Sequence, residues 1–354
     1  MSNTPSHDKL RIGAMAEGAD RWLAVQPLPD FAPLEGLGLA TAGVFMPEGL
    51  EPILFDATDQ APNPRGTFAI VDAAIYSLLP DILEASECRH KCLFQGQALQ
   101  DSGDAAPWLV QLAPDNVLTR QLMSSQKNPG GMWEMELGIF VKSALPFDQL
   151  WGHLRKFTRI EDEDGQWLYN RYWAPPVSTR VMALGNRPEL TQMISPLFPK
   201  EDPDFEVVLL NHDLNATLKR VPGTVPPIAR PVLTTAAHRT IRQVRRVQQY
   251  EELIEIAMRH VKGKTDLSDS DVYSVLRLKR DGLFEAGFWQ RDHLVKLMVW
   301  EVLLGPDFIT HYASGAVKAI ILAAKAPYEA IMKIEIFLEA QEARRKEQEE
   351  AGNI

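Results

Sequence analysis

Cysteine is scarce in this sequence of 354 residues, and the two that occur are Cys88 and Cys92. A secreted scaffold held together by disulfides would carry several pairs, so that class of protein is excluded. The N-terminus, MSNTPSHDKLRIG, does not show the basic and then apolar order of a secretory signal. We therefore expect a protein of the reducing cytoplasm.

Long apolar runs and an excess of positive charge are also missing. The most apolar late stretch, Ala316 to Ala326, is interrupted by Lys318 and Lys325. A membrane helix needs about 20 apolar residues, so we expect no membrane insertion. The net charge of −10 at pH 7 argues against broad binding to nucleic acid, which needs a basic surface. A local basic patch remains open.

Catalytic and metal-binding motifs are missing as well. No Gly-x-Ser-x-Gly motif occurs, and Gly130-Gly131 is not followed by the Lys-Ser/Thr of a phosphate loop. On a strand, Cys88, His90 and Cys92 would point to one face, but a zinc site usually needs four ligands and no second pair is present. We therefore predict no catalytic residue, no metal and no cofactor.

The most informative pattern that is present lies between Phe147 and Trp173. From Phe147 to Phe157 the apolar residues recur at steps of three and four, which places them on one face of a helix. A polar run, Glu161 to Gly165, then interrupts, and Trp167, Tyr169, Arg171 and Trp173 follow in β alternation. The pattern predicts a helix, a strand, a tight turn and a second strand.

Four short pieces precede this segment in a recognisable order. They are Ala-Ile-Val-Asp-Ala-Ala from Ala69, Leu-Phe-Gln-Gly from Leu93, Ala-Pro-Trp-Leu-Val-Gln-Leu from Ala106 and Leu-Gly-Ile-Phe from Leu137. Together the five pieces resemble the adaptor/chaperone family of bacterial type VI secretion (Tap or TEC adaptors), over about residues 65–184. One difference is that Arg171-Tyr172-Trp173 is followed by Ala174-Pro175, where the family tends to have Asp-Pro.

The resemblance implies a non-catalytic adaptor. Such a protein would bind a cognate toxic effector and help to load it onto the spike protein of the type VI apparatus, so its expected partners are that effector and that spike. Two alternatives stay open: an enzyme whose active site is built from dispersed residues, and a structural component of the secretion machine.

Strand and helix signals predict an α+β protein, with an N-terminal mixed α/β domain followed by an all-α helical domain. The expected parts are an N-terminal extension with a few short strands (1–64), the α/β adaptor domain (65–220), a Pro-rich linker (221–237) and the helical domain (238–354). Within them, the apolar runs 43–46 and 53–55 suggest short strands, the run 67–72 suits a buried strand, and residues 282–304 are expected to form one helix. The linker is placed by four prolines between Val221 and Pro231, which neither a helix nor a central strand tolerates.

Candidate partner-binding residues come from both domains. Arg155, Arg159 and Arg171 are candidates: Arg155 lies on the helix side that faces away from the apolar stripe, and Arg171 alternates with Tyr169 and Trp173. An arginine among aromatic residues can pair with an internal carboxylate or bind another protein chain. Tyr172 and Trp173 are added because they continue the same strand. In the helical domain the aromatic residues exceed what one small core needs, and Phe288, Trp289 and Trp300 are the candidates there.

Overall fold

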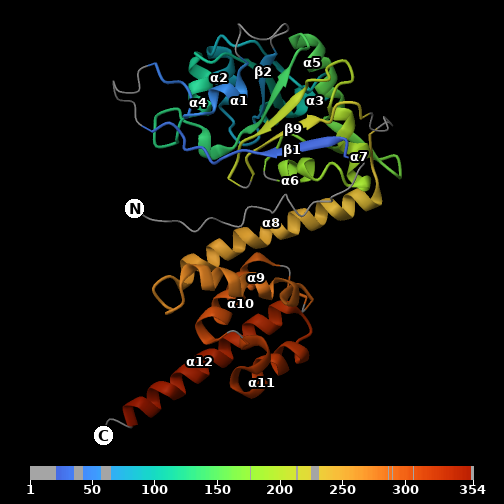
Figure 1. The fold of residues 1–354 in the computed structure, drawn as a ribbon. Coiled ribbons are helices and arrows are strands. Elements are labelled where there is room, and N and C mark those ends of the chain that lie inside the picture. The colour runs from blue at the N-terminus through green and yellow to red at the C-terminus, as the bar shows by residue number, and fades with distance from the viewer. Residues whose placement is uncertain are drawn as a thin grey trace. The chain divides into compact units, whose positions relative to one another are not determined.

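A computed structural model describes residues 21–35, 43–56, 65–175, 177–212, 214–224, 231–285, 287–288, 290–305 and 307–351. The chain divides into two compact units between Val244 and Arg245, called here the α/β unit and the helical unit (Figure 1). The α/β unit contains the sheets, and the described part of the helical unit contains helices alone. The predicted α+β class is confirmed.

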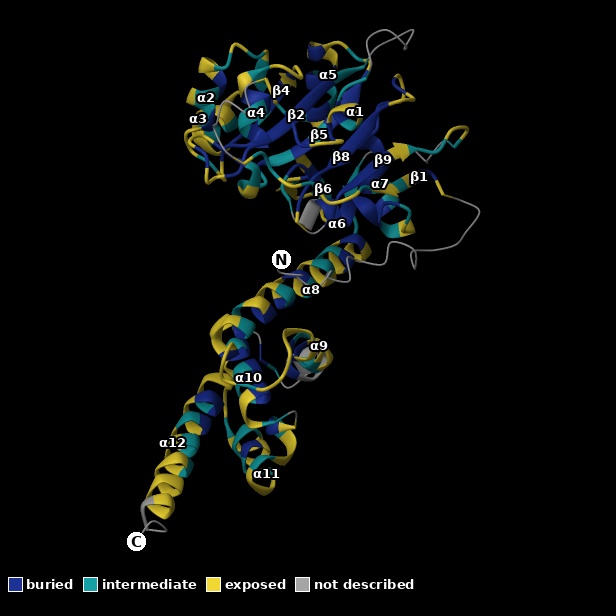
Figure 2. Cartoon of the chain, turned by 60° about the vertical axis from the view of Figure 1, so that its left-hand side comes forward, coloured by how far each residue is buried: buried dark blue, intermediate teal, exposed yellow. Residues whose placement is uncertain are grey.

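A seven-stranded sheet with the order β1-β9-β8-β5-β2-β4-β3 forms the centre of the α/β unit. All neighbouring strands in it are antiparallel. Its strands are β1 (Leu23–Pro27), β2 (Gly66–Asp72), β3 (His90–Cys92), β4 (Pro107–Leu112), β5 (Gly138–Ser143), β8 (Glu206–Leu209) and β9 (Ala216–Arg220). Figure 2 shows the central strands in the dark blue of buried residues.

Both faces of this sheet are covered. In β2, Phe68 and Ile70 belong to one apolar cluster, whereas Ala69 and Val71 belong to another on the opposite face. The first face is packed by α5 (Phe147–Leu154), α6 (Val177–Ala183) and α7 (Pro188–Ile194), and the second by α1 (Glu51–Leu54), α2 (Leu79–Ala85) and α4 (Val117–Leu122). A short helix, α3 (Gln97–Ser102), follows β3. Burial on two sides explains why β2 is a continuous apolar run.

Gly138, at the start of β5, permits close pairing between β5 and β2. A Cβ atom at this position would lie 1.8 Å from the backbone oxygen of Ile70. No side-chain rotation could relieve that overlap, because the obstacle is backbone of the neighbouring strand. The glycine of the Leu-Gly-Ile-Phe piece is therefore required by the sheet itself.

A second, three-stranded sheet holds the predicted hairpin. It is ordered β10-β6-β7, from β6 (Arg159–Asp162), β7 (Trp167–Tyr169) and β10 (Val232–Leu233). The strands β6 and β7 are antiparallel, and β10 joins β6 in parallel. At the hairpin tip, Glu163 Oε2 accepts hydrogen bonds from Thr235 N at 2.8 Å and Thr235 Oγ1 at 2.5 Å. These bonds lower the pKa of the Glu163 carboxyl.

Five helices follow: α8 (Thr235–Val261), α9 (Asp269–Glu285), α10 (Arg291–Leu304), α11 (Phe308–Ala323) and α12 (Pro327–Ala351). The unit boundary falls within α8. The sequence predicted one helix from 282 to 304, but α9 runs on to Glu285 and α10 begins at Arg291, because Gly287 has a φ of 85° and Phe288 is buried. In α11, Ala313 (φ 48°) and Ser314 (φ 59°) are left-handed and break the helix.

The N-terminal segment and the linker differ in detail from the prediction. Ile53 and Leu54, expected in a short strand, lie in α1, and Gly43 to Met46 form no strand, whereas β1 supplies an edge of the main sheet. In the predicted linker 221–237, residues 225–230 lie outside the described residues, and 232–233 form β10. In the described part of the chain, none of the helices has the length and apolar character required to span a membrane.

Candidate functional site

Asp72, the last residue of β2, is the anchor of the site. Its side chain is 0% exposed. Oδ2 accepts hydrogen bonds from Arg171 Nη2 at 2.5 Å and from Trp173 Nε1 at 2.9 Å, and Oδ1 accepts one from Ala74 N at 3.0 Å. Two of the sequence pieces that carry the resemblance therefore meet in space, although they are about 100 positions apart.

Tyr172 and Trp173, proposed from the sequence as partner-binding residues, are core residues in this structure. Trp173 is 1% exposed, and the hydroxyl of Tyr172 donates to Leu154 O at 3.1 Å. Burial also raises the pKa of the Tyr172 phenol, so it stays protonated. Buried side chains offer no surface to a partner, and the two residues serve to fix the segment that carries Arg171.

The residues next to this anchor present aromatic rings at the surface. Trp167 is 50% exposed and Tyr169 is 59% exposed, both on β7. The Arg159 guanidinium carbon lies 5.6 Å from the Trp167 ring centre and 5.8 Å from that of Tyr169. Arg159 and Tyr169 are paired across β6 and β7, so the three side chains share one face of the hairpin.

Further cations contact Trp151 of α5. Lys91 Nζ lies 3.7 Å from the ring centre and the Arg155 guanidinium carbon lies 5.0 Å from it. Trp151 itself is buried and donates from Nε1 to Cys92 O at 2.8 Å. The Phe94 ring, two residues after Cys92, lies 5.7 Å from that of Tyr169, so the Trp151 region adjoins β7.

We call this surface the cationic aromatic patch and define it by six residues. They are Lys91, Arg155, Arg159, Trp167, Tyr169 and Arg171. All three arginines that the sequence suggested are among these six residues, and Arg171, paired internally to Asp72, is still 52% exposed. Of the two interpretations that the sequence left open, Arg171 shows pairing with an internal carboxylate, and binding of another protein chain stays a prediction.

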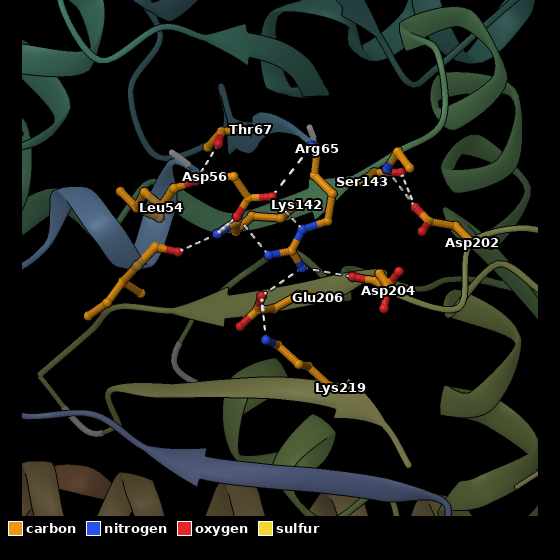
Figure 3. A network of polar contacts seen from close by, with 12 residues as sticks. Leu54, Asp56, Arg65, Thr67, Lys142, Ser143, Asp202, Asp204, Glu206 and Lys219 are labelled. Atoms are coloured by element: carbon orange, nitrogen blue, oxygen red, sulfur yellow. Dashed lines mark hydrogen bonds and ion pairs between the residues drawn. The ribbon is translucent and has the colours of Figure 1, made fainter. Parts of the chain in front are cut away.

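A separate group of charges near the opposite end of β2 has a structural role (Figure 3). The Asp56 carboxylate lies 2.8 Å from Arg65 Nη2 and 2.6 Å from Lys142 Nζ. Glu206 Oε2 lies 3.0 Å from Arg65 Nη1 and 3.0 Å from Lys219 Nζ. Hydrogen bonding to Arg65 holds the pKa of the Asp56 carboxyl well below its usual range. The network ties the chain after α1 to strands β5, β8 and β9.

The helical unit places its candidates differently from the prediction. Phe288 is buried in the core, and Trp300 is partly buried with its ring 5.7 Å from that of Phe308. Trp289 lies outside the described residues. Exposed apolar side chains occur on several helices of this unit, and on α12 three of them, Tyr328, Met332 and Ile336, share one face at steps of four.

The cysteine cluster forms no metal site in the structure. Cys88 is half-buried and Cys92 is buried, both are free, and burial raises the pKa of each thiol. His90 Nδ1 contacts Cys88 O at 2.8 Å instead of facing both sulfurs. Within the described ranges, no group of three or more His, Cys, Asp or Glu side chains is arranged to hold a metal ion.

Residues 67–192 match a family model described as a domain of unknown function (DUF4123). The match covers about a third of the chain, from β2 to α7, and includes Asp72 and Arg171. This family is associated with effectors and chaperones of type VI secretion, which agrees with the resemblance seen in the sequence. Comparisons with curated proteins and with solved structures gave no match.

Sequence reasoning missed Lys91 and underrated the two rings of β7. The alternation of Trp167, Tyr169, Arg171 and Trp173 was visible, but it does not say which rings are covered. The strand β7 ends at Tyr169, and the chain beyond it directs Trp173 inward to Asp72, whereas Trp167 and Tyr169 on the strand stay at the surface.

Proposed function

We propose that the protein is a non-catalytic cytoplasmic adaptor of type VI secretion, which binds one cognate toxic effector and helps to load it onto the spike protein. The observation that carries this proposal is the DUF4123 match over 67–192, whose residues also build the Asp72 anchor and all six positions of the cationic aromatic patch. A family associated with effectors is expected to present a protein-binding surface, and the patch has the residue types found at such surfaces.

The adaptor has a physical reason to exist. An effector segment with an exposed apolar surface tends to aggregate until it is assembled, and a complementary surface on a carrier keeps it soluble. Release then requires only that the spike complex offer the effector a state of lower free energy. No nucleotide or cofactor enters this scheme.

The test is deletion of the gene in the native bacterium, followed by quantitative mass spectrometry of the secreted proteins. We expect one effector to disappear from the medium while tube and spike proteins are still exported. Re-expression of the wild-type protein should restore that effector. Loss of all type VI secretion would indicate a structural component of the machine, and unchanged export of every effector would refute the adaptor function.

A further inference from the structure

We propose that the cationic aromatic patch binds an acidic, partly apolar segment of a partner polypeptide. This inference rests on the adaptor function proposed above, and it names the chemistry of the segment that the adaptor recognises. It is drawn from the side chains of the hairpin β6–β7 and the adjoining edge of α5.

The charges of the patch favour carboxylates. Arg159 lies against the Trp167 and Tyr169 rings, and an arginine stacked in this way keeps its N–H groups available in the plane of the guanidinium. Arg171 is held by Asp72 from below, yet 52% of its side chain is exposed. The guanidinium groups of Arg159, on the hairpin, and of Arg171, just after it, can donate hydrogen bonds to carboxylates of a partner, in bidentate fashion where two N–H groups point the same way.

The acidic groups near the patch are accounted for. Asp72, from β2, is fully buried and is directed at Arg171 and Trp173. Glu161 is opposite Trp167 on β6, and Asp148, from α5, lies 3.5 Å from Lys91 Nζ. These carboxylates neutralise part of the positive charge of the patch. Arg159 and Arg155 instead contact aromatic rings, so their charges remain available to a partner.

The exposed rings favour apolar neighbours between the acidic ones. Trp167 and Tyr169 flank Arg159, and Trp and Tyr at a surface supply large contact areas at a small cost in conformational entropy. Lys91 and Arg155 continue the same character to Trp151. A bound segment therefore meets cations and rings in alternation, which suits acidic residues interspersed with aromatic or aliphatic ones.

The same mixture of cations and rings is found where proteins bind single-stranded nucleic acid, so that occupant needs to be weighed. The tip of this hairpin carries Glu161, Asp162, Glu163 and Asp164 in succession. A continuous polyanion that follows β7 would meet these carboxylates, and the chain as a whole has a net charge of −10. A polypeptide with separate carboxylates can avoid the tip, and for this reason we favour it.

The experiment uses the full-length purified protein and a phage library that displays random 12-residue peptides. Peptides are selected on the wild type and counter-selected on Arg159→Glu. We expect the recovered peptides to be enriched in Asp and Glu together with aromatic or aliphatic residues. A labelled peptide from this set should bind about tenfold more weakly to Arg159→Glu and to Trp167→Ala in fluorescence anisotropy. Its affinity should also fall as salt is raised.

Two matched variants in the helical unit serve as controls. Arg344→Glu makes the same charge reversal at an exposed arginine of α12, and Tyr328→Ala removes an exposed ring without touching the hairpin. Both should bind the peptide as the wild type does. The proposal would be overturned if Arg159→Glu bound the peptide as tightly as the wild type or if the selected peptides were not enriched in acidic residues. Tighter binding of a 20-nucleotide oligo-dT than of the selected peptide would also overturn it.

The result separates this inference from the proposed function. Loss of one effector in the deletion strain, without acidic peptides in the selection, overturns the patch alone. Recovery of acidic peptides that need Arg159, with normal export of every effector in the deletion strain, supports the patch and refutes the adaptor function.

Discussion

Removal of the Arg171 side chain should destabilise the α/β unit much more than removal of Arg159, although both guanidinium groups reach the surface. Arg171→Ala leaves the fully buried Asp72 carboxylate with Trp173 Nε1 and Ala74 N as its remaining donors. Breaking a buried ion pair from one side costs about 3–5 kcal/mol. Because 52% of Arg171 is exposed, solvent already screens part of the pair, and we expect about 2–3 kcal/mol.

Thermal unfolding measured by scanning calorimetry provides the assay. For a unit of this size the loss corresponds to a Tm about 5–10 °C lower. Arg159→Ala, which gives up only surface contacts with two rings, should cost about 1 kcal/mol or less. Asp72→Asn in the Arg171→Ala background removes the uncompensated charge, so the double variant should be more stable than Arg171→Ala alone. Equal losses for the two arginines, or additive losses in the double variant, would refute the reasoning.

Three other predictions concern stability. Arg65 holds the pKa of Asp56 below its unfolded value, so the ionised carboxylate stabilises the fold above the unfolded pKa, and this contribution is lost as pH falls towards the folded pKa. From pH 7 to pH 3 the urea midpoint should therefore decline less steeply for Asp56→Asn than for the wild type, and parallel curves would contradict this. Gly138→Ala places a Cβ against the Ile70 backbone, and such overpacking should lower the free energy of unfolding by about 1–3 kcal/mol or more. Gly152→Ala in α5 meets no atom within 4 Å and should raise it by up to about 1 kcal/mol, so shifts in unfolding temperature of the same sign for the two variants would contradict this reasoning. Ala313→Gly relieves a left-handed residue with a φ of 48° and should raise the stability of the helical unit by about 1 kcal/mol, so a lower unfolding temperature would count against strain at the break in α11.

Periodicity predicted those elements whose burial is decided locally. The apolar face of α5 and the two-sided run of β2 were visible because their spacing repeats over several residues. The strands β1 and β9 were not predicted, since they are short, pair with each other across about 190 positions, and have side chains that are only partly buried in β1. Such pairing depends on tertiary contacts, which a propensity does not contain.

The candidate site was predicted in part for the same reason. The sequence located Arg171 among aromatic residues, and in the structure Arg155 contacts Trp151, Arg159 contacts Trp167 and Arg171 pairs with Asp72. Whether a ring is covered depends on a partner elsewhere in the chain, such as Asp72 for Trp173. The surplus of aromatic residues in the helical unit did not identify exposed rings, because Phe288 is buried and Trp300 is partly buried. The exposed apolar face of α12 is built from Tyr328, Met332 and Ile336.

The hairpin that carries part of the patch also contacts the first residue of the long helix α8. Its first strand pairs with β10, and Glu163 at its tip caps the helix at Thr235 through two hydrogen bonds. Thermodynamic linkage is reciprocal: a partner that binds more tightly to the ordered hairpin must stabilise the capped first turn of α8 by the same coupling free energy. Hydrogen exchange of the backbone amides that follow Thr235 should therefore slow when a partner binds to the patch, and its rate can be used to measure how much of the patch is occupied.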